Sequence, residues 1–162
     1  MKSYIKLNIG LDFDNTLITY DLLFKDLAVK KGLISANFPE DKKLIRKHLK
    51  DSGNEELFTS LQAEVYGLNI KDAEPSPHML SALKLIKAKG ANIIIVSHKT
   101  KVPYSGPAYD LRKGALEWMS KNEFFSKTGL SLQRKCVFFE GTKEEKIQRE
   151  PEERQQGTGT PR

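Results

Sequence analysis

Residues 9 to 17 read Ile-Gly-Leu-Asp-Phe-Asp-Asn-Thr-Leu, and this stretch places two carboxylates, Asp12 and Asp14, directly after an apolar run. In an extended strand, residues two positions apart point to the same side, so both carboxylates can face one site. Neighbouring carboxylates repel each other, which favours either a protonated member or a cation between them. The alternative is that Asp12 and Asp14 only end a strand and cap a helix, as short acidic side chains also do.

The length and composition indicate one domain of ordinary size. The chain has 162 residues, 38% of them hydrophobic, which suffices for one core and a small accessory module. Its formal charge is +6, but lysine and arginine are interleaved with aspartate and glutamate, so we interpret the charge as a solvated surface and expect no nucleic-acid partner. No apolar segment has the length of a membrane span or the pattern of a signal peptide, so we expect a cytoplasmic protein that does not bind membranes.

Three short apolar runs have the pattern of buried strands, and helical patterns separate them. The runs cover residues 4–11, 92–96 and 136–139. From 21 to 67, apolar residues recur every three or four positions in three sets, two of which end at glycines suited to a left-handed cap, Gly32 and Gly67. Further helical patterns occur at 79–86 and 108–121. This alternation of strands and helices predicts an α/β fold with a parallel sheet.

Ser97 directly follows the second apolar run. Ligands of parallel sheets bind outside the carboxyl ends of the strands, so neighbouring strands would place Ser97 beside Asp12 and Asp14. The alternative is that Ser97 is there for turn geometry, a common reason for serine after a strand. His98 comes next, and we interpret it as a surface or substrate-loop residue. Lys99, Lys101 and Tyr104 could contact a substrate, but we interpret them as part of an ordinary polar loop.

The string from Asp12 to Leu17 resembles the first motif of the haloacid dehalogenase-like (HAD) superfamily, whose phosphatase members carry Asp-x-Asp-x-Thr at the end of their first strand. The resemblance implies a Rossmann-like three-layer parallel sheet with a small helical cap inserted after the first strand. It also implies that Asp12 is the nucleophile and that Asp14 protonates the leaving group and then activates water. Ser97 resembles the second motif, whose hydroxyl binds a phosphoryl oxygen.

The resemblance also implies a division of the chain. Residues 1–19 and 75–147 would form the Rossmann-like core, residues 20–74 the helical cap, and residues 148–162, which have a polar composition without an apolar run, a disordered tail. A cap over the site would exclude water and favour a small phosphorylated metabolite as the substrate.

The third motif of the family is a lysine near the start of a late helix, and the sequence offers Lys143 and Lys146. Thr142 and Glu145 have the spacing of a capping box, which would place Lys143 in the first helical turn, so we prefer Lys143. Its charge would keep Asp12 ionised and offset the charge of the bound phosphoryl group. The alternative is a solvated helix face that carries many charges.

The resemblance implies Mg²⁺ as the cofactor, with the side chain of Asp12 and the backbone carbonyl of Asp14 as ligands. A fourth motif would add acidic residues after a further apolar strand, but no apolar run follows Ile147. The chain therefore looks like a HAD phosphatase that is truncated or frame-altered before this motif, or a member of a branch that lost it. We expect a Mg²⁺-dependent hydrolase of small phosphomonoesters with impaired activity. The strand at 4–11 would lie at an exposed sheet edge, through which molecules can self-associate.

Two other classes of protein compete with this interpretation. One is a catalytically inactive HAD-like binding or interaction protein. The other is a phosphoacceptor receiver domain, which also combines aspartates, a serine or threonine and a lysine on a parallel sheet. A receiver domain needs its acceptor after the third strand, whereas both aspartates here follow the first strand.

Overall fold

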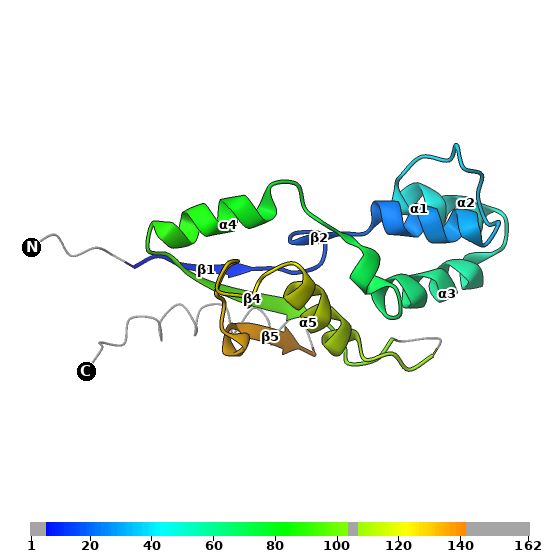
Figure 1. Cartoon of the computed structure of the whole chain (residues 1–162). Helices are drawn as coiled ribbons and strands as arrows, with labels where there is room; N and C mark the ends of the chain where they lie inside the picture. The colour runs from blue at the N-terminus through cyan, green and yellow to red at the C-terminus, as the bar shows by residue number, and fades with distance from the viewer. Residues whose placement is uncertain (1–5, 104–106, 142–162) are drawn as a thin grey trace, which may run out of the picture. The chain divides into compact units, whose positions relative to one another are not determined.

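A computed structural model gives the structure of the chain and describes residues 6–103 and 107–141. Within these ranges the chain forms two units, which we describe separately (Figure 1). The sheet unit contains residues 6–17, 76–100 and 119–141, and the helical unit contains residues 18–75, 101–103 and 107–118. No helix in the described ranges is long and apolar enough to cross a membrane.

The sheet unit is built on three parallel strands in the order β1-β4-β5 (Figure 1). They are β1 (Asn8–Leu11), β4 (Asn92–His98) and β5 (Val137–Glu140). The central strand β4 carries a run of β-branched residues, which suits a strand that is buried within a sheet. The register pairs Leu11 with Ile95 and Ser97 with Phe139. The predicted α/β class, with its parallel sheet, is therefore confirmed.

Helix α4 (Met79–Ala88) runs along one face of β1 in Figure 1 and buries Met79 and Leu83. Gly90 has a φ of 87° after the helix, so it forms the left-handed end that glycine allows. Two lysines of α4 hold the loop that precedes β5. Lys84 donates to the carbonyl of Thr128 at 3.1 Å, and Lys87 donates to the carbonyls of Leu130 and Ser131.

The helical unit contains three packed helices, a short antiparallel pair of strands and the start of a further helix. Its elements are α1 (Asp21–Lys30), α2 (Lys42–Asp51), α3 (Glu55–Tyr66), the 3₁₀ turn η1 (Ile70–Asp72), β2 (Ile18–Thr19), β3 (Glu74–Pro75) and most of α5 (Leu111–Lys121). The three helical patterns predicted between 21 and 67 are confirmed. Aromatic rings form much of the core: Phe24 stacks on Phe58 with 5.7 Å between ring centroids, and Tyr20 meets Tyr66 edge-on at 4.6 Å.

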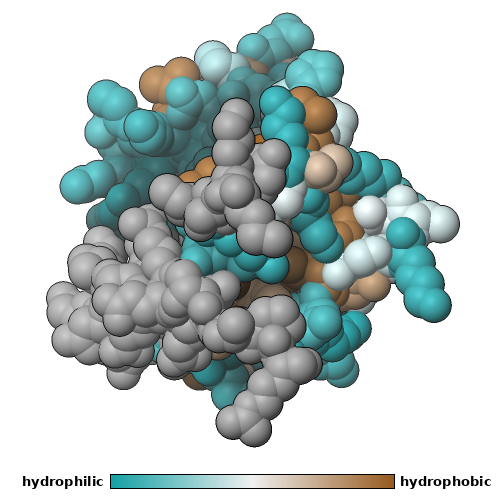
Figure 2. All heavy atoms as spheres, turned by 90° about the vertical axis from the view of Figure 1, so that its left-hand side faces the viewer, coloured by the Kyte–Doolittle hydropathy of each residue, from teal (hydrophilic) through white to brown (hydrophobic). Residues whose placement is uncertain are grey.

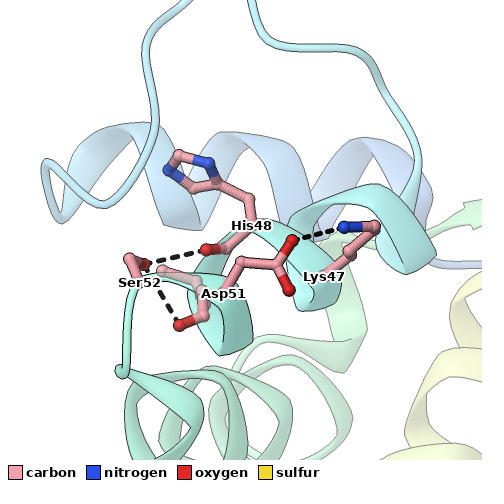
Figure 3. A network of polar contacts seen from close by, with 5 residues as sticks. Lys47, His48, Asp51 and Ser52 are labelled. Carbon is pink, nitrogen blue, oxygen red and sulfur yellow. Dashed lines mark hydrogen bonds and ion pairs between the residues drawn. The ribbon is translucent and has the colours of Figure 1, made fainter.

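Polar side chains define both ends of α2. Asp41 caps the N-terminus by accepting from the backbone N–H groups of the first turn. At the other end, the Ser52 hydroxyl donates to the carbonyl of His48 at 2.8 Å, and Lys47 pairs with Asp51 (Figure 3). The Lys47–Asp51 pair is exposed to solvent, so it contributes little to stability.

Residues 107–118 group with the helical unit, whereas the sequence analysis places them in the core. One contact within this unit is the hydrogen bond that the indole N–H of Trp118 donates to the carbonyl of Ala73 at 2.8 Å. The predicted left-handed conformation of Gly67 is wrong, since its φ is −103°. A side chain is excluded there for another reason: a Cβ on Gly67 would lie 2.4 Å from the ring of Tyr109.

An open groove of about 510 Å³ lies beside β1, next to the C-terminal end of α4. Its lining is mainly apolar and consists of Lys6, Leu7, Ile9, Ile86, Lys89, Gly90 and Ala91. Figure 2 faces the end of the sheet where β1 begins and shows hydrophobic residues among hydrophilic ones. Leu7 is 59% exposed there, so apolar surface faces solvent at the start of the strand.

We predict that Gly129→Ala destabilises the sheet unit by about 3 kcal/mol or more, because the added Cβ would lie 1.8 Å from the backbone carbonyl oxygen of Glu123. Gly90→Ala is the control: its Cβ meets no atom within 4 Å, so only the positive φ opposes it, at a cost of about 1 kcal/mol. Urea unfolding measures both free energies. Equal costs for the two variants would contradict the steric explanation.

Candidate functional site

The three parallel strands end at one edge of the sheet, and polar residues gather at that edge. Asp12 and Asp14 follow β1, Ser97 lies near the end of β4, and Glu140 is the last residue of β5. The predicted adjacency of the first two strands is confirmed, since β1 and β4 pair directly. The carboxylates and the serine therefore belong to neighbouring strands although they are distant in sequence.

A hydrogen-bonded turn follows β1, and the two carboxylates lie at its start. The carbonyl of Phe13 accepts hydrogen bonds from the N–H groups of Thr16, at 3.3 Å, and Leu17, at 3.0 Å. The Phe13 side chain is fully buried and anchors this turn in the core. Asp12 and Asp14 flank Phe13 and are both half-buried, and Asp12 accepts from the backbone N–H of Phe13 at 2.8 Å. The local packing thus fixes the backbone on which both carboxylates sit.

A partly buried ion pair joins the end of β1 to the end of β4. Lys99 Nζ lies 3.1 Å from Asp14 Oδ1, and the Lys99 side chain is only 5% exposed while that of Asp14 is 27% exposed. The backbone N–H of Lys99 donates to the carbonyl of Glu140 at 3.2 Å, which fixes this residue to β5. The ammonium also lies 5.5 Å from the centroid of the Phe13 ring. The prediction that Lys99 belongs to an ordinary polar loop is therefore wrong.

Ser97 is completely buried, and its Oγ has no hydrogen-bond partner within the part of the chain that the structure describes. The same is true of His98 Nδ1, although His98 itself is only half-buried. A buried hydroxyl without a partner costs free energy, so such groups are rare unless water or a ligand meets them. Ser97 is therefore poised to bond a group that enters the site.

Of the two further polar residues at this edge, Glu140 was not predicted, and Lys99 was predicted as a loop residue in preference to a substrate contact, although each had a signal in the sequence. Lys99 stands two residues after Ser97, the same spacing that relates Asp14 to Asp12. Glu140 directly follows the third apolar run and is 9% exposed, an unusual degree of burial for a carboxylate. Lys143, which the sequence analysis preferred as the site lysine, and its alternative Lys146 lie outside the described residues.

The residues available for a metal ion are the carboxylate of Asp12 and the oxygens of Asp14. Within residues 6–103 and 107–141, no three His, Cys, Asp or Glu side chains come together as a metal-binding group. Oxygen donors match Mg²⁺ in kind, and Mg²⁺ commonly uses one or two carboxylates together with water and a substrate phosphate. The residues therefore fit a magnesium ion whose coordination the phosphate completes, and they do not fit an all-protein cage.

Comparisons with protein-family models, with curated proteins and with solved structures give no match for this chain. Its function must therefore be argued from the residues at the carboxyl edge of the sheet. The main observation in favour of a functional site is that Asp12, Asp14 and Ser97 lie at the ends of neighbouring strands. Lys99 forms an ion pair with Asp14 there.

We predict that Asp14→Asn lowers the free energy of unfolding by about 2 to 3 kcal/mol, because it removes the negative charge that faces the buried Lys99 ammonium. In a Lys99→Met background the same change should cost at least about 1 kcal/mol less, since the positive charge is gone. Urea unfolding of the single and double variants measures this coupling. Asp51→Asn, which breaks the exposed Lys47–Asp51 pair, is the control and should cost under about 1 kcal/mol. Equal costs of Asp14→Asn in both backgrounds would contradict the prediction.

Proposed function

We propose that this protein is a Mg²⁺-dependent hydrolase of small phosphomonoesters that acts through an aspartyl-phosphate intermediate, as the resemblance to HAD phosphatases implies. The observation that carries the proposal is the direct parallel pairing of β1 with β4, which puts Asp12 and Asp14 at the strand ends next to Ser97. A Rossmann-like core with a helical cap after its first strand is the fold that we propose with it. Its support is the strand order and the position of α1, α2 and α3 between β1 and β4 in the chain.

In the proposed reaction, the Asp12 carboxylate attacks phosphorus in line with the leaving oxygen. The bond from phosphorus to that oxygen breaks, and Asp14, which has to be protonated in the complex with substrate, donates its proton to the oxygen, so the alcohol leaves neutral. Asp14 then takes a proton from water, which attacks the aspartyl-phosphate, releases phosphate and restores Asp12. Bound Mg²⁺, held by Asp12 and the backbone carbonyl of Asp14, would offset the negative charge of the phosphate.

Asp14 is the reason to favour phosphate esters over organic halides. An alkoxide is a poor leaving group and gains from a proton donor, whereas a halide leaves without one. Lys99 holds the Asp14 carboxylate at the end of β4, which limits the positions from which that carboxylate can act. A small metabolite is the class of substrate that we propose, because a cap admits small molecules more easily than macromolecules.

We predict that the protein releases inorganic phosphate from p-nitrophenyl phosphate and that Asp12→Asn lowers kcat by about 1,000-fold or more, because the amide is not a nucleophile. The rate should keep rising with Mg²⁺ through the millimolar range, since few protein oxygens hold the ion. A malachite-green assay measures the released phosphate. Asp51→Asn makes the same chemical change on the surface of α2 and should leave the rate unchanged. Absence of phosphate release at saturating Mg²⁺ would overturn the proposed function.

The second candidate is a non-catalytic interaction protein, and the groove beside β1 favours it. In the described part of the chain, β1 is an edge strand, and the groove next to it has an apolar lining that includes Leu7 and Ile9. Strands at open edges pair with strands of other molecules, so self-association through β1 is the interaction that we propose under this alternative.

For this alternative we predict concentration-dependent dimers in size-exclusion chromatography with light scattering, and a shift toward monomer on Leu7→Lys. Leu7 is 59% exposed, so a lysine there adds charge to the edge without removing a core residue. Leu68→Lys is the control, because Leu68 is equally exposed, at 59%, but belongs to the helical unit. A wild-type protein that stays monomeric at all concentrations and hydrolyses phosphomonoesters would exclude this candidate.

A further inference from the structure

We propose that Lys99 is the cation of the phosphate-binding site, beside the Ser97 hydroxyl that the resemblance to HAD phosphatases already assigns to a phosphoryl oxygen. The inference rests on the proposed function for its choice of ligand, a phosphomonoester or inorganic phosphate. It assigns to Lys99 the substrate-binding role for which the sequence analysis preferred Lys143. Ser97 and Lys99 belong to the three-residue segment Ser-His-Lys at the carboxyl end of the central strand.

Backbone pairing places the two side chains together. Ser97 lies in β4 and pairs with Phe139 of β5, and the N–H of Lys99 still donates to the carbonyl of Glu140. The ladder between β4 and β5 therefore continues to Lys99. Residues two apart on extended backbone point to one side, and both side chains are at least nine-tenths buried. A hydroxyl and an ammonium consequently converge at the strand end, beside the carboxylates that follow β1.

The bonding capacity of these groups suits a phosphate. Ser97 Oγ is buried without a hydrogen-bond partner in the described residues, and a hydroxyl can donate to an anionic oxygen. Lys99 carries an ammonium with three N–H donors, so it can bond a carboxylate and a phosphate oxygen at once. Hydrogen bonds from a charged donor are shorter and stronger than neutral ones, and burial reduces the screening by water. The ion pair holds the ammonium 3.1 Å from Asp14, one of the two carboxylates that follow β1.

The charge of Asp12 decides how this role of Lys99 can be tested. Asp12, Asp14 and Glu140 bring three carboxylates to this edge of the sheet and Lys99 brings one ammonium, so a phosphate is repelled unless a cation is added. Replacing Asp12 by asparagine lowers that repulsion and also stops turnover. An Asp12→Asn protein should therefore bind inorganic phosphate even when EDTA removes all metal, and the binding should depend on Ser97 and Lys99.

The experiment is isothermal titration of inorganic phosphate into Asp12→Asn protein in EDTA. We expect measurable binding of phosphate by the Asp12→Asn protein. Lys99→Met should weaken this binding by about 10- to 100-fold, because a hydrogen bond from a charged donor is lost. Ser97→Ala should weaken it by about 10-fold, because a neutral hydrogen bond is lost. Lys99→Arg keeps the charge and should retain most of the binding, which separates loss of charge from loss of folding. Lys89→Met is the matched control, because Lys89 is an exposed lysine of the same unit at the end of α4.

A turnover readout complements the titration. With Mg²⁺ and an intact Asp12, Lys99→Met should raise KM for p-nitrophenyl phosphate by at least about 10-fold, a change that altered folding alone does not produce in the folded fraction. The inference is overturned if Lys99→Met binds phosphate as tightly as its parent, or if Lys143→Met loses the binding and Lys99→Met does not. If the Asp12→Asn protein binds phosphate as expected but the wild-type protein hydrolyses no phosphomonoester, the role of Lys99 is supported and the proposed function is overturned. The failure of the inference can therefore be distinguished from the failure of the proposed function.

Discussion

The parallel pairing of β1 with β4 is the constraint on which the rest of the structure depends. The two strands are joined by hydrogen bonds from Asn8 to Leu11, although eighty residues of chain separate them. The pairing is stable because β4 is central and buries Ile95 and Val96 completely. Everything proposed for the site follows from it, because only this contact brings the carboxylates after β1 to the polar residues after β4.

The sequence predicted the parts of the fold that depend on local apolar patterns. The strands at 92–96 and 136–139 and the three helices after the first strand follow from periodicity alone, since each buries one stripe of side chains. The backbone conformation of Gly67 was mispredicted because glycine can follow a helix for two reasons. Either the backbone needs a positive φ, or a neighbouring group leaves no room for a side chain. Only the position of the ring of Tyr109, which is 42 positions further along the chain, distinguishes them.

The candidate site was predictable in its carboxylates and serine but not in its lysine. Asp12 and Asp14 are recognisable in the sequence because two carboxylates after an apolar strand are unusual. Ser97 is recognisable because it directly follows an apolar run that predicts a strand. Lysine is common in exposed loops, so composition argues against burial of Lys99. Its burial depends on an ion pair with a residue of another strand, and a contact of that kind has no local sequence signal.

The alternation of side chains along β1 and β4 has a consequence for how the site tolerates change. Side chains alternate between the two faces of the sheet along β1 and β4, so the register between these strands decides which residues face the core. A slip of one residue between the strands would turn polar groups into the core and apolar groups out of it. Misaligned molecules would lose the hydrophobic core and the alignment of the polar strand ends in one step. The same register therefore sets the packing of the core and the position of Asp12 and Asp14 relative to Ser97, so a molecule that is well packed is also correctly aligned.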